Sequence, residues 1–191
     1  MAVGALAACN AAAQPNASDL LDLSIEELAN LKITSASRIE ENLRDAPAAV
    51  FVITAVDIRR SGVTSIPEAL RLAPGVEVAR RSAYEWSISI RGFNSNIANK
   101  LLVLIDGRSV YSPLFAGVFW DAQDTLLEDI ERIEVISGPG GTLWGANAVN
   151  GVINIVTKKS QNTQGGLLYG GAGSEERGFG SFRHGGRLGD D

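Results

Sequence analysis

Between residues 47 and 159 the spacing of apolar and polar positions changes repeatedly, and each change marks a predicted element. An apolar run of strand length over residues 50–53 is followed by a short helical pattern over residues 55–61. Residues 101–105 are apolar throughout, which predicts a strand buried on both faces. Short helices interleaved with strands in one block predict an α/β (α+β) fold with a small mixed β-sheet.

Turn and capping residues set the ends of the helices. Thr54 and Asp57 bracket the first helix, and Gly62 ends it. Ser65 and Glu68 stand three residues apart, which predicts a capping box at the start of a second helix that a Pro-Gly pair ends.

Further strands are indicated by alternation and by turn chemistry. Residues 76–78 and 88–90 alternate between apolar and polar, so each segment predicts a half-buried strand, and the alternation over residues 132–136 predicts another strand. An Asp-Gly pair at residues 106–107 predicts a hairpin whose return strand covers residues 109–111.

The most distinctive motif is the glycine-rich run GPGGTLWGANAVNGVINIVTK at residues 138–158. It predicts a tight turn, one short helical turn, a second glycine turn and then a strand over residues 152–156. No Gly-Lys-Ser/Thr follows, so the P-loop pattern is absent, and Leu143 stands where the dinucleotide fingerprint needs its third glycine. Phosphate binding is therefore rejected, which leaves a generic glycine loop or a family signature.

Composition narrows the class of protein. The chain has 191 residues, 45% of them hydrophobic and 20% charged, which is typical of a globular domain. The net charge of −5 argues against nucleic acid, because no basic stripe faces the phosphates. No apolar stretch approaches the roughly 18 residues of a membrane helix.

The first residues resemble the end of an export signal. No charge precedes Asp19, and small residues up to Ala13 offer an ordinary cleavage site, which is favoured over lipidation at Cys9. A single cysteine excludes an internal disulfide. We expect export to the periplasm or outer membrane, with a residual signal peptide over residues 1–13 whose start is missing or mis-called.

The segment between this signal and the main block has three parts. Ser24 and Glu27 predict a capping box for a short helix that ends near Lys32. Residues 33–38 are β-prone and small, with no obvious partner, and residues 40–46 are interpreted as a linker.

After Lys159 the chain becomes rich in glycine, and residues 167–169 and 179–183 read as alternating strands with aromatic side chains. Such segments are typical of the opening strands of a transmembrane β-barrel. Two strands cannot close a barrel, because an open edge in lipid leaves backbone groups unpaired. We therefore interpret the chain as a fragment of a larger receptor.

Four motifs, in order, resemble the plug domain of TonB-dependent outer-membrane receptors. They are Ile90-Arg91-Gly92-Phe93, the Leu-Ile-Asp-Gly hairpin ending at Gly107, the stretch from Ile130 to Pro139, and the glycine-rich run. The resemblance implies the plug fold over residues 47–159. It also implies a periplasmic N-terminal segment over residues 14–46 and the start of a truncated β-barrel over residues 160–191.

The resemblance also implies partners. A Ton box binds the periplasmic protein TonB, which works with an inner-membrane energising complex, by adding an exposed strand; the alternative is a linker or a frayed strand. The remaining partners are the protein's own β-barrel, the outer membrane and a small-molecule ligand such as an iron-siderophore or a vitamin. The Ton box residues are Ile33, Thr34, Ser35, Ala36 and Ser37.

Charged residues are implied to face the barrel. Relatives usually carry Arg immediately before the Gly-Pro pair, where this chain has Ser137, so plug retention is expected to weaken unless the barrel has changed too. The barrel-contact role is carried over to Arg91 and, less directly, to Glu131, Arg132 and Glu134.

Ligand-binding residues are expected in the loops, including the one predicted over residues 112–124. Some of the loop aromatics are expected to pack in the core, and others to form a floor that touches a polar organic molecule. The candidates are Tyr84, Trp86, Asn94, Tyr111, Phe115 and Trp120.

Catalytic and metal chemistry find no support in the sequence. His184 is the only histidine, so a Ser-His-Asp triad and a histidine zinc site are not indicated. An acidic cluster lacks the spacing of a calcium loop and is interpreted as a solvated face. Its members are Asp121, Asp124, Glu128, Asp129, Glu131 and Glu134.

The leading hypothesis is therefore a transport gate, the plug of an active outer-membrane importer, with no catalytic activity, cofactor or metal. The alternative is a free periplasmic ligand-binding module or a decayed receptor fragment without transport activity. An enzyme is a distant third.

Overall fold

The computed structural model describes residues 32–33, 41–42, 49–95, 99–114, 116–174 and 177–186. The expected signal peptide, Cys9 and the expected capping box at Ser24 lie outside these residues. The described residues form two compact units, one reaching Thr157 and the other starting at Lys158. Each unit is described by itself below.

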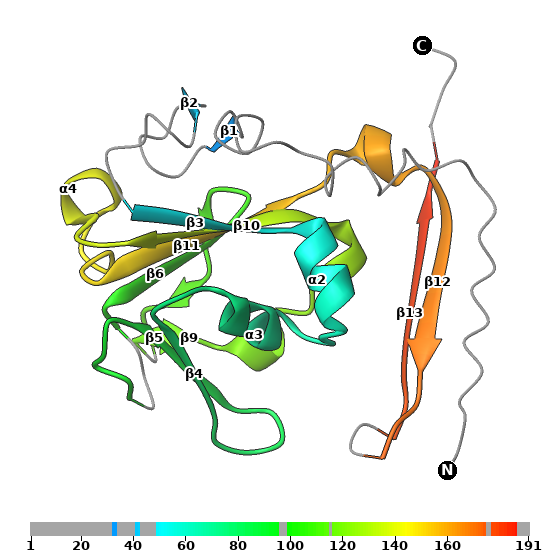
Figure 1. Ribbon diagram of the computed structural model, residues 1–191, viewed down its shortest axis with the longest axis horizontal. Coiled ribbons are helices and arrows are strands. Elements are labelled where there is room, and N and C mark those ends of the chain that lie inside the picture. Colours follow the sequence, from blue (N-terminus) through cyan, green and yellow to red (C-terminus); the bar gives the residue numbers. More distant parts are fainter. Residues whose placement is uncertain are drawn as a thin grey trace. The chain divides into compact units, whose positions relative to one another are not determined.

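A five-stranded mixed sheet organises the first unit (Figure 1). Strand β11 runs parallel to β6, and all other neighbours in the sheet are antiparallel. The predicted small mixed sheet is confirmed. In spatial order its strands are β3 (Ala49–Thr54), β10 (Ile130–Ser137), β11 (Gly151–Thr157), β6 (Leu101–Ile105) and β7 (Arg108–Ser109).

Short helices and a hairpin complete this unit. Helices α2 (Ala55–Ser61) and α3 (Ile66–Ala69) are followed by the 3₁₀ helix η2 (Leu70–Leu72). Strands β4 (Val76–Arg80) and β5 (Trp86–Ile90) pair as an antiparallel hairpin. The smaller elements are β1 (Lys32–Ile33), β2 (Glu41–Asn42), β8 (Tyr111–Ser112), β9 (Gly117–Val118), η3 (Trp120–Ala122), η4 (Leu127–Asp129) and α4 (Gly141–Trp144).

Both faces of the sheet carry buried side chains. Alternation along β10 places Ile133 and Val135 on one face and Glu134 and Ile136 on the other. The first face packs in the larger core, which also includes residues of α2, α3 and β5. The smaller core on the second face consists of Leu102, Leu104, Ile136, Ala148 and Val152.

One strand is more buried than its alternation predicts. Residues 88–90 are predicted to be half-buried, but β5 is buried on both faces. In β5 the hydroxyl-bearing Ser87 and Ser89 are as buried as Ile88 and Ile90. The prediction is wrong here because a polar residue in a central position is covered by the tertiary structure whatever its hydropathy.

Two further expectations are corrected. The loop predicted over residues 112–124 contains β9 and η3, and β9 pairs with β8. The linker predicted over residues 40–46 contains β2, which pairs with β1. Two-residue strands leave no detectable alternation in the sequence, so the pattern could not reveal them.

Only one of the two predicted N-terminal helix caps forms in the described residues. Thr54 and Asp57 make a reciprocal capping box on α2, and Gly62 ends the helix at φ 68°. Ser65 makes no side-chain cap on α3, so the capping box predicted there is wrong. The Glu68 carboxylate instead accepts from the backbone N–H of Thr64 at 3.3 Å.

This difference predicts unequal effects of removing the two hydroxyls. Thr54→Ala is expected to lower the free energy of unfolding by about 1 kcal/mol, because α2 loses its cap. Ser65→Ala is expected to change it by less than about 0.5 kcal/mol, since the Ser65 hydroxyl is buried without a hydrogen-bond partner among the described residues. Urea unfolding followed by tryptophan fluorescence measures both, and equal losses would contradict the assignment.

The glycine-rich run folds as predicted. Gly138 has φ 144° and Gly145 has φ 95°, with the single turn of α4 between them and β11 following. The predicted hairpin at residues 106–107 is also confirmed, because Ile105 pairs with Arg108 across a two-residue turn. None of the described helices has the length and apolar character needed to cross a bilayer.

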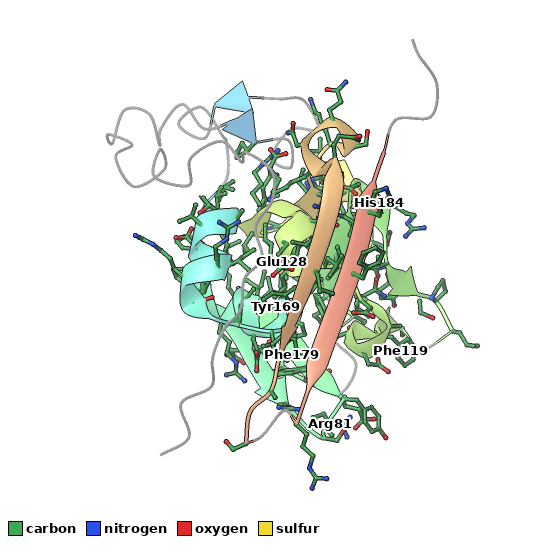
Figure 2. All side chains as sticks on the ribbon, turned by 90° about the vertical axis from the view of Figure 1, so that its right-hand side faces the viewer. Arg81, Phe119, Glu128, Tyr169, Phe179 and His184 are labelled. Carbon is green, nitrogen blue, oxygen red and sulfur yellow. The ribbon has the colours of Figure 1, made fainter. Side chains whose placement is uncertain are left out.

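The second unit is built on an antiparallel hairpin. Strands β12 (Gly165–Gly171) and β13 (Phe179–Gly185) pair along their whole lengths, after the 3₁₀ helix η5 (Ser160–Thr163). The rings of Tyr169 and Phe179 lie 5.2 Å apart on one face (Figure 2). Leu168 and Phe182 pair across the other face and are mostly exposed. The two predicted strands are confirmed.

Candidate functional site

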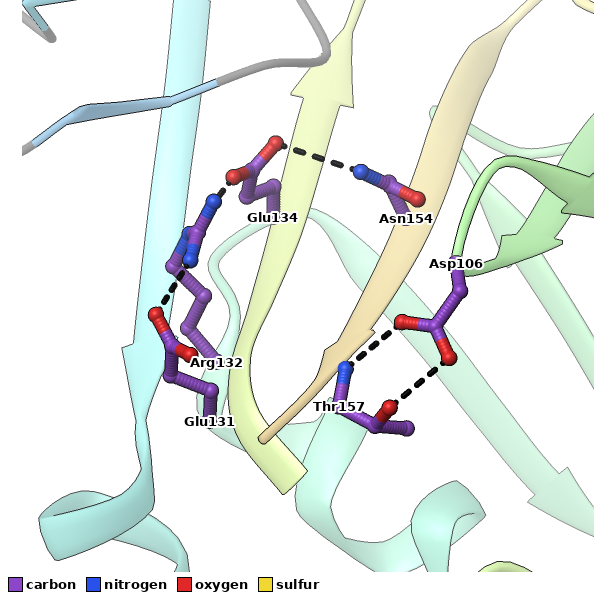
Figure 3. A network of polar contacts seen from close by, with 6 residues as sticks. All are labelled: Asp106, Glu131, Arg132, Glu134, Asn154 and Thr157. Atoms are coloured by element: carbon purple, nitrogen blue, oxygen red, sulfur yellow. Dashed lines mark hydrogen bonds and ion pairs between the residues drawn. The ribbon is translucent and has the colours of Figure 1, made fainter. Parts of the chain in front are cut away.

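A charged network lies on the second face of the sheet, along β10 and β11 (Figure 3). The Arg132 guanidinium donates from Nε to Glu134 Oε1 and from a terminal nitrogen to Glu131 Oε1, both at 2.7 Å. Asn154 Nδ2 donates to the second oxygen of Glu134 at 3.4 Å. One arginine is therefore shared by two carboxylates.

Burial in this network increases from Glu131 to Glu134. The Glu131 side chain is 42% exposed, the Arg132 side chain 13% and the Glu134 side chain 0%. The register of β10 against β11 shifts between Ile130 and Arg132. Such an irregularity in a strand re-aims the side chains next to it, which brings two consecutive residues, Glu131 and Arg132, into one contact.

The interpretation of the acidic residues as a solvated face is wrong at Glu134. Its carboxylate is buried between neighbouring strands, and a buried charge needs a partner of opposite sign. Arg132 provides that partner, so the ion pair of Arg132 and Glu134 stabilises the interior of the unit. Among the described residues, no three His, Cys, Asp or Glu side chains group as metal ligands would.

Arg91, the other predicted barrel-contact residue, lies away from this network. The network sits where Arg132 pairs with Val156 in the β10–β11 ladder. Arg91 follows Ile90, whose side chain lies close to Gly151 at the other end of that ladder. The structure therefore separates Arg91 from the three residues with which it was grouped.

The predicted ligand residues are not brought together at one site. Trp120 is 7% exposed and packs in the larger core, whereas Tyr84 and Asn94 are exposed and Tyr111 is half-buried. Trp86 is half-buried, and the Arg80 guanidinium lies 5.2 Å from its ring centre. Phe115 lies outside the described residues.

Trp86 and Trp120 do border one cavity. Ser87, Ile88, Leu101, Val103 and Val118 complete its lining. Its volume of about 10 Å³ holds about one water molecule and no organic ligand.

The predicted Ton box is described only at Ile33. Its side chain is 0% exposed, and β1 pairs with β2 through Ile33 and Glu41. The expectation of an exposed segment without a partner is therefore wrong at this residue. Thr34, Ser35, Ala36 and Ser37 lie outside the described residues.

One contact was missed by the sequence analysis. The Asp106 carboxylate accepts from the backbone N–H and the hydroxyl of Thr157, both at 2.8 Å (Figure 3). It ties the β6–β7 turn to the last residue of the first unit. The two residues are far apart in sequence, so no local pattern links them.

Apart from Tyr84, the exposed apolar side chains on the described loops were not assigned a role. Figure 2 labels Phe119, which is one of them, and Arg81 at the turn of the β4–β5 hairpin. The exposed fraction of such residues cannot be read from their position in a loop. The largest exposures in the first unit belong to Leu114, Phe93 and Tyr84.

The first unit is thus a small domain with a mixed sheet and paired internal charges, and its cavity beside Trp86 and Trp120 holds about one water molecule. The family model for the TonB-dependent receptor plug domain matches residues 42–152. The chain belongs to this family of plug domains.

Two curated relatives and one solved structure illustrate the similarity. The vitamin B12 transporter BtuB of Vibrio vulnificus is 36% identical over 145 residues, which cover 75% of this chain and 23% of that protein. The iron-regulated outer membrane virulence protein of Vibrio cholerae is 37% identical over 140 residues, which cover 70% and 21%. The pyoverdine outer membrane receptor FpvA of Pseudomonas aeruginosa PAO1, bound to pyoverdine, gives a TM-score of 0.59 at 26% identity, covering 76% and 20%.

The chain spans less than a quarter of the length of each of these proteins. One of them is named as a transporter and one as a receptor, and two are named as outer-membrane proteins. The plug family places this chain in a receptor of the outer membrane.

Proposed function

We propose that this chain gates an active outer-membrane importer, which binds a scarce ligand such as an iron-siderophore or a vitamin and draws energy from TonB. The match of the plug family to residues 42–152 carries the proposal. The named relatives act on vitamin B12 and pyoverdine, which supports a scarce organic ligand.

The proposal assigns a different role to each part of the chain. Residues 14–46 hold the Ton box, residues 47–159 form the plug and residues 160–191 begin the barrel that surrounds it. The boundary between the two compact units, at Thr157, supports a change of role close to residue 159. The antiparallel hairpin of β12 and β13 supports the receptor over a free periplasmic module, because its exposed Leu168 and Phe182 pair on one face, as apolar side chains do on the lipid-facing side of a barrel.

The barrel-contact role is proposed for Arg91, Glu131, Arg132 and Glu134, and the ligand-contact role for Tyr84, Trp86, Asn94, Tyr111, Phe115 and Trp120. Arg132 pairs with two carboxylates of the same unit. This supports a role in stabilising the plug itself, in addition to any contact with the barrel wall. The exposure of Tyr84 and Asn94 supports contact with a ligand.

Proline at the Ton box tests the coupling to TonB. Ile33→Pro is expected to reduce capture of the chain by the C-terminal domain of TonB at least about tenfold, because strand addition depends on backbone donors that proline lacks. A pull-down with immobilised TonB domain measures the captured fraction.

Asp45→Pro is the matched control, because it places proline in the same N-terminal segment outside the box. It is expected to leave capture unchanged, and far-ultraviolet circular dichroism of both variants checks that the fold persists. Equal capture of Ile33→Pro and the unaltered chain would remove the Ton box assignment. Growth of a deletion strain on single iron or vitamin sources then identifies the imported ligand.

A further inference from the structure

A side-chain contact extends the sheet of the first unit at the point where the chain leaves this unit. Strand β6 ends at Ile105, which pairs with Ile155 of β11, so Thr157 lies two residues past the last β6 partner. The Asp106 carboxylate spans this step, because it accepts from the backbone N–H and the hydroxyl of Thr157, both at 2.8 Å (Figure 3). We name this contact the exit clip, since the chain passes into the second unit directly after Thr157.

The turn that carries Asp106 holds its carboxylate in place. Asp106 and Gly107 have φ of 49° and 77°, the left-handed pair of a two-residue hairpin turn. The Asp106 N–H donates to the Ile155 carbonyl at 2.9 Å. Both the backbone and the side chain of Asp106 are therefore bound to β11.

The other neighbour of Thr157 holds it less regularly. Thr157 pairs with Ile130, the first residue of β10, but the register of this ladder shifts between Ile130 and Arg132. Such a shift disrupts the hydrogen bonds of a ladder locally. The exit clip therefore supports β11 at an end where its pairing with β10 is interrupted.

The strand order determines how a pull on the two ends of the first unit loads this end of β11. Strands β3 and β11 run in the same direction, because each is antiparallel to β10, which lies between them. Ala49, where β3 begins, therefore lies at the opposite end of the sheet from Thr157, where β11 ends. A pull on the chain before Ala49 and after Thr157 slides β3 and β11 in opposite directions.

Sliding of this kind loads a whole ladder at once. The hydrogen bonds of an antiparallel ladder are perpendicular to its strands, so motion along the strands strains all of them together. Six residue pairs join β3 to β10 and seven join β10 to β11, and these pairs share the load. They share it only while the end of β11 stays in the sheet, because fraying from Thr157 opens the ladder pair by pair. The exit clip opposes this fraying.

We propose that the exit clip is a mechanical latch, which keeps β11 in the sheet while TonB pulls on the N-terminal segment. The Asp106 carboxylate and the Thr157 hydroxyl form the latch through hydrogen bonds alone. This inference rests on the proposed function, because it requires a pull on the segment that holds the Ton box. The latch places the resistance to that pull at the last residue of the first unit.

Pulling on single molecules of the full chain tests the latch. Cys9 is the only cysteine, so Cys9→Ser with Asp45→Cys and Lys159→Cys gives one attachment point before β3 and one after β11. Thr157→Val keeps the branched shape but removes the hydroxyl, and it is expected to raise the unfolding rate at constant load about fivefold. Thr157→Ser keeps the hydroxyl and is expected to change the rate less than about twofold. Equal rates for Thr157→Val and the unaltered side chain overturn the proposal.

Two further variants check that the clip itself is responsible. Asp106→Asn retains the turn, because asparagine also adopts the left-handed backbone, and its neutral oxygen is expected to weaken the clip and raise the rate. Ser61→Ala is the matched control, since it removes a hydroxyl that donates to the Ile58 carbonyl at 2.7 Å on α2, outside the three loaded strands. It is expected to leave the rate unchanged. A rise as large as that of Thr157→Val overturns the proposal.

A second pair of attachment points distinguishes a latch from a general contribution to stability. Asp45→Cys with Lys100→Cys places both points at the sheet end where β3 and β6 begin, so the load bypasses Thr157. Thr157→Val is then expected to leave the unfolding rate unchanged, because the sheet opens from the end opposite the clip. An equal rise in both pulling geometries overturns the proposal. Far-ultraviolet circular dichroism of each variant checks the fold before pulling.

These results are separable from the proposed function, because the pulling experiment contains no TonB. A fivefold effect of Thr157→Val in a chain that TonB does not capture refutes the coupled importer and supports the clip as a load-bearing contact. TonB capture with unfolding rates that Thr157→Val leaves unchanged refutes the latch alone.

Discussion

Replacing Arg132 with alanine is expected to lower the free energy of unfolding by about 3–5 kcal/mol, the cost of breaking a buried ion pair by removing one of its members. Glu134 is fully buried, and the Arg132 guanidinium donates to it at 2.7 Å. Asn154 remains as a partner, but its amide is neutral and its contact is longer, at 3.4 Å. Urea unfolding of the chain followed by tryptophan fluorescence measures the loss, with the slope against urea checked for constancy.

The other members of the network provide the controls. Glu131→Gln removes a carboxylate that is 42% exposed and is expected to cost at most about 1 kcal/mol. Arg132→Met combined with Glu134→Met removes both buried charges and is expected to recover most of the lost stability. If Arg132→Ala costs no more than Glu131→Gln, the buried pair does not hold the second face of the sheet.

Alanine at Gly151 is expected to destabilise the first unit by about 3 kcal/mol, the upper end for overpacking of a core. A Cβ at this position would lie 2.5 Å from the Ile136 carbonyl oxygen and 2.8 Å from Ile90 Cδ1. The contact with Ile90 involves only the end of a side chain, whereas the backbone oxygen belongs to β10 and moves only with the strand. The close approach of β10 to β11 therefore requires glycine at residue 151.

Gly141→Ala is the matched control from the same glycine-rich run. A Cβ there would meet only the Ala148 carbonyl oxygen at 3.9 Å, which is ordinary contact. Alanine at a helical position also favours the helix over glycine, so this variant is expected to be neutral or slightly more stable. If Gly151→Ala and Gly141→Ala lower the free energy of unfolding by similar amounts in the same urea titration, close packing does not explain the glycine at residue 151.

Both predictions concern the rigidity of the first unit. The buried pair holds the second face of the sheet, and Gly151 lets its two central strands approach. The Asp106–Thr157 contact fixes the last residue of the first unit to the β6–β7 turn. Contacts that stabilise the first unit therefore lie at both ends of β11.

Local chemistry determined most elements from the sequence alone. The apolar run at residues 101–105, the Thr54–Asp57 cap, the turn at residues 106–107 and the glycine-rich run each act within a few residues, so their signals are complete in the chain. The same holds for the family, because the ordered motifs that suggested a plug domain are contiguous stretches.

Tertiary structure alone decided which polar residues are buried and which residues meet. Its acidic character placed Glu134 on a solvated face, but the structure buries this side chain completely. No local pattern joined Asp106 to Thr157 either, because their contact closes a long loop. A sequence records the propensity of each residue, whereas burial and the pairing of charges depend on the strand order that folding sets.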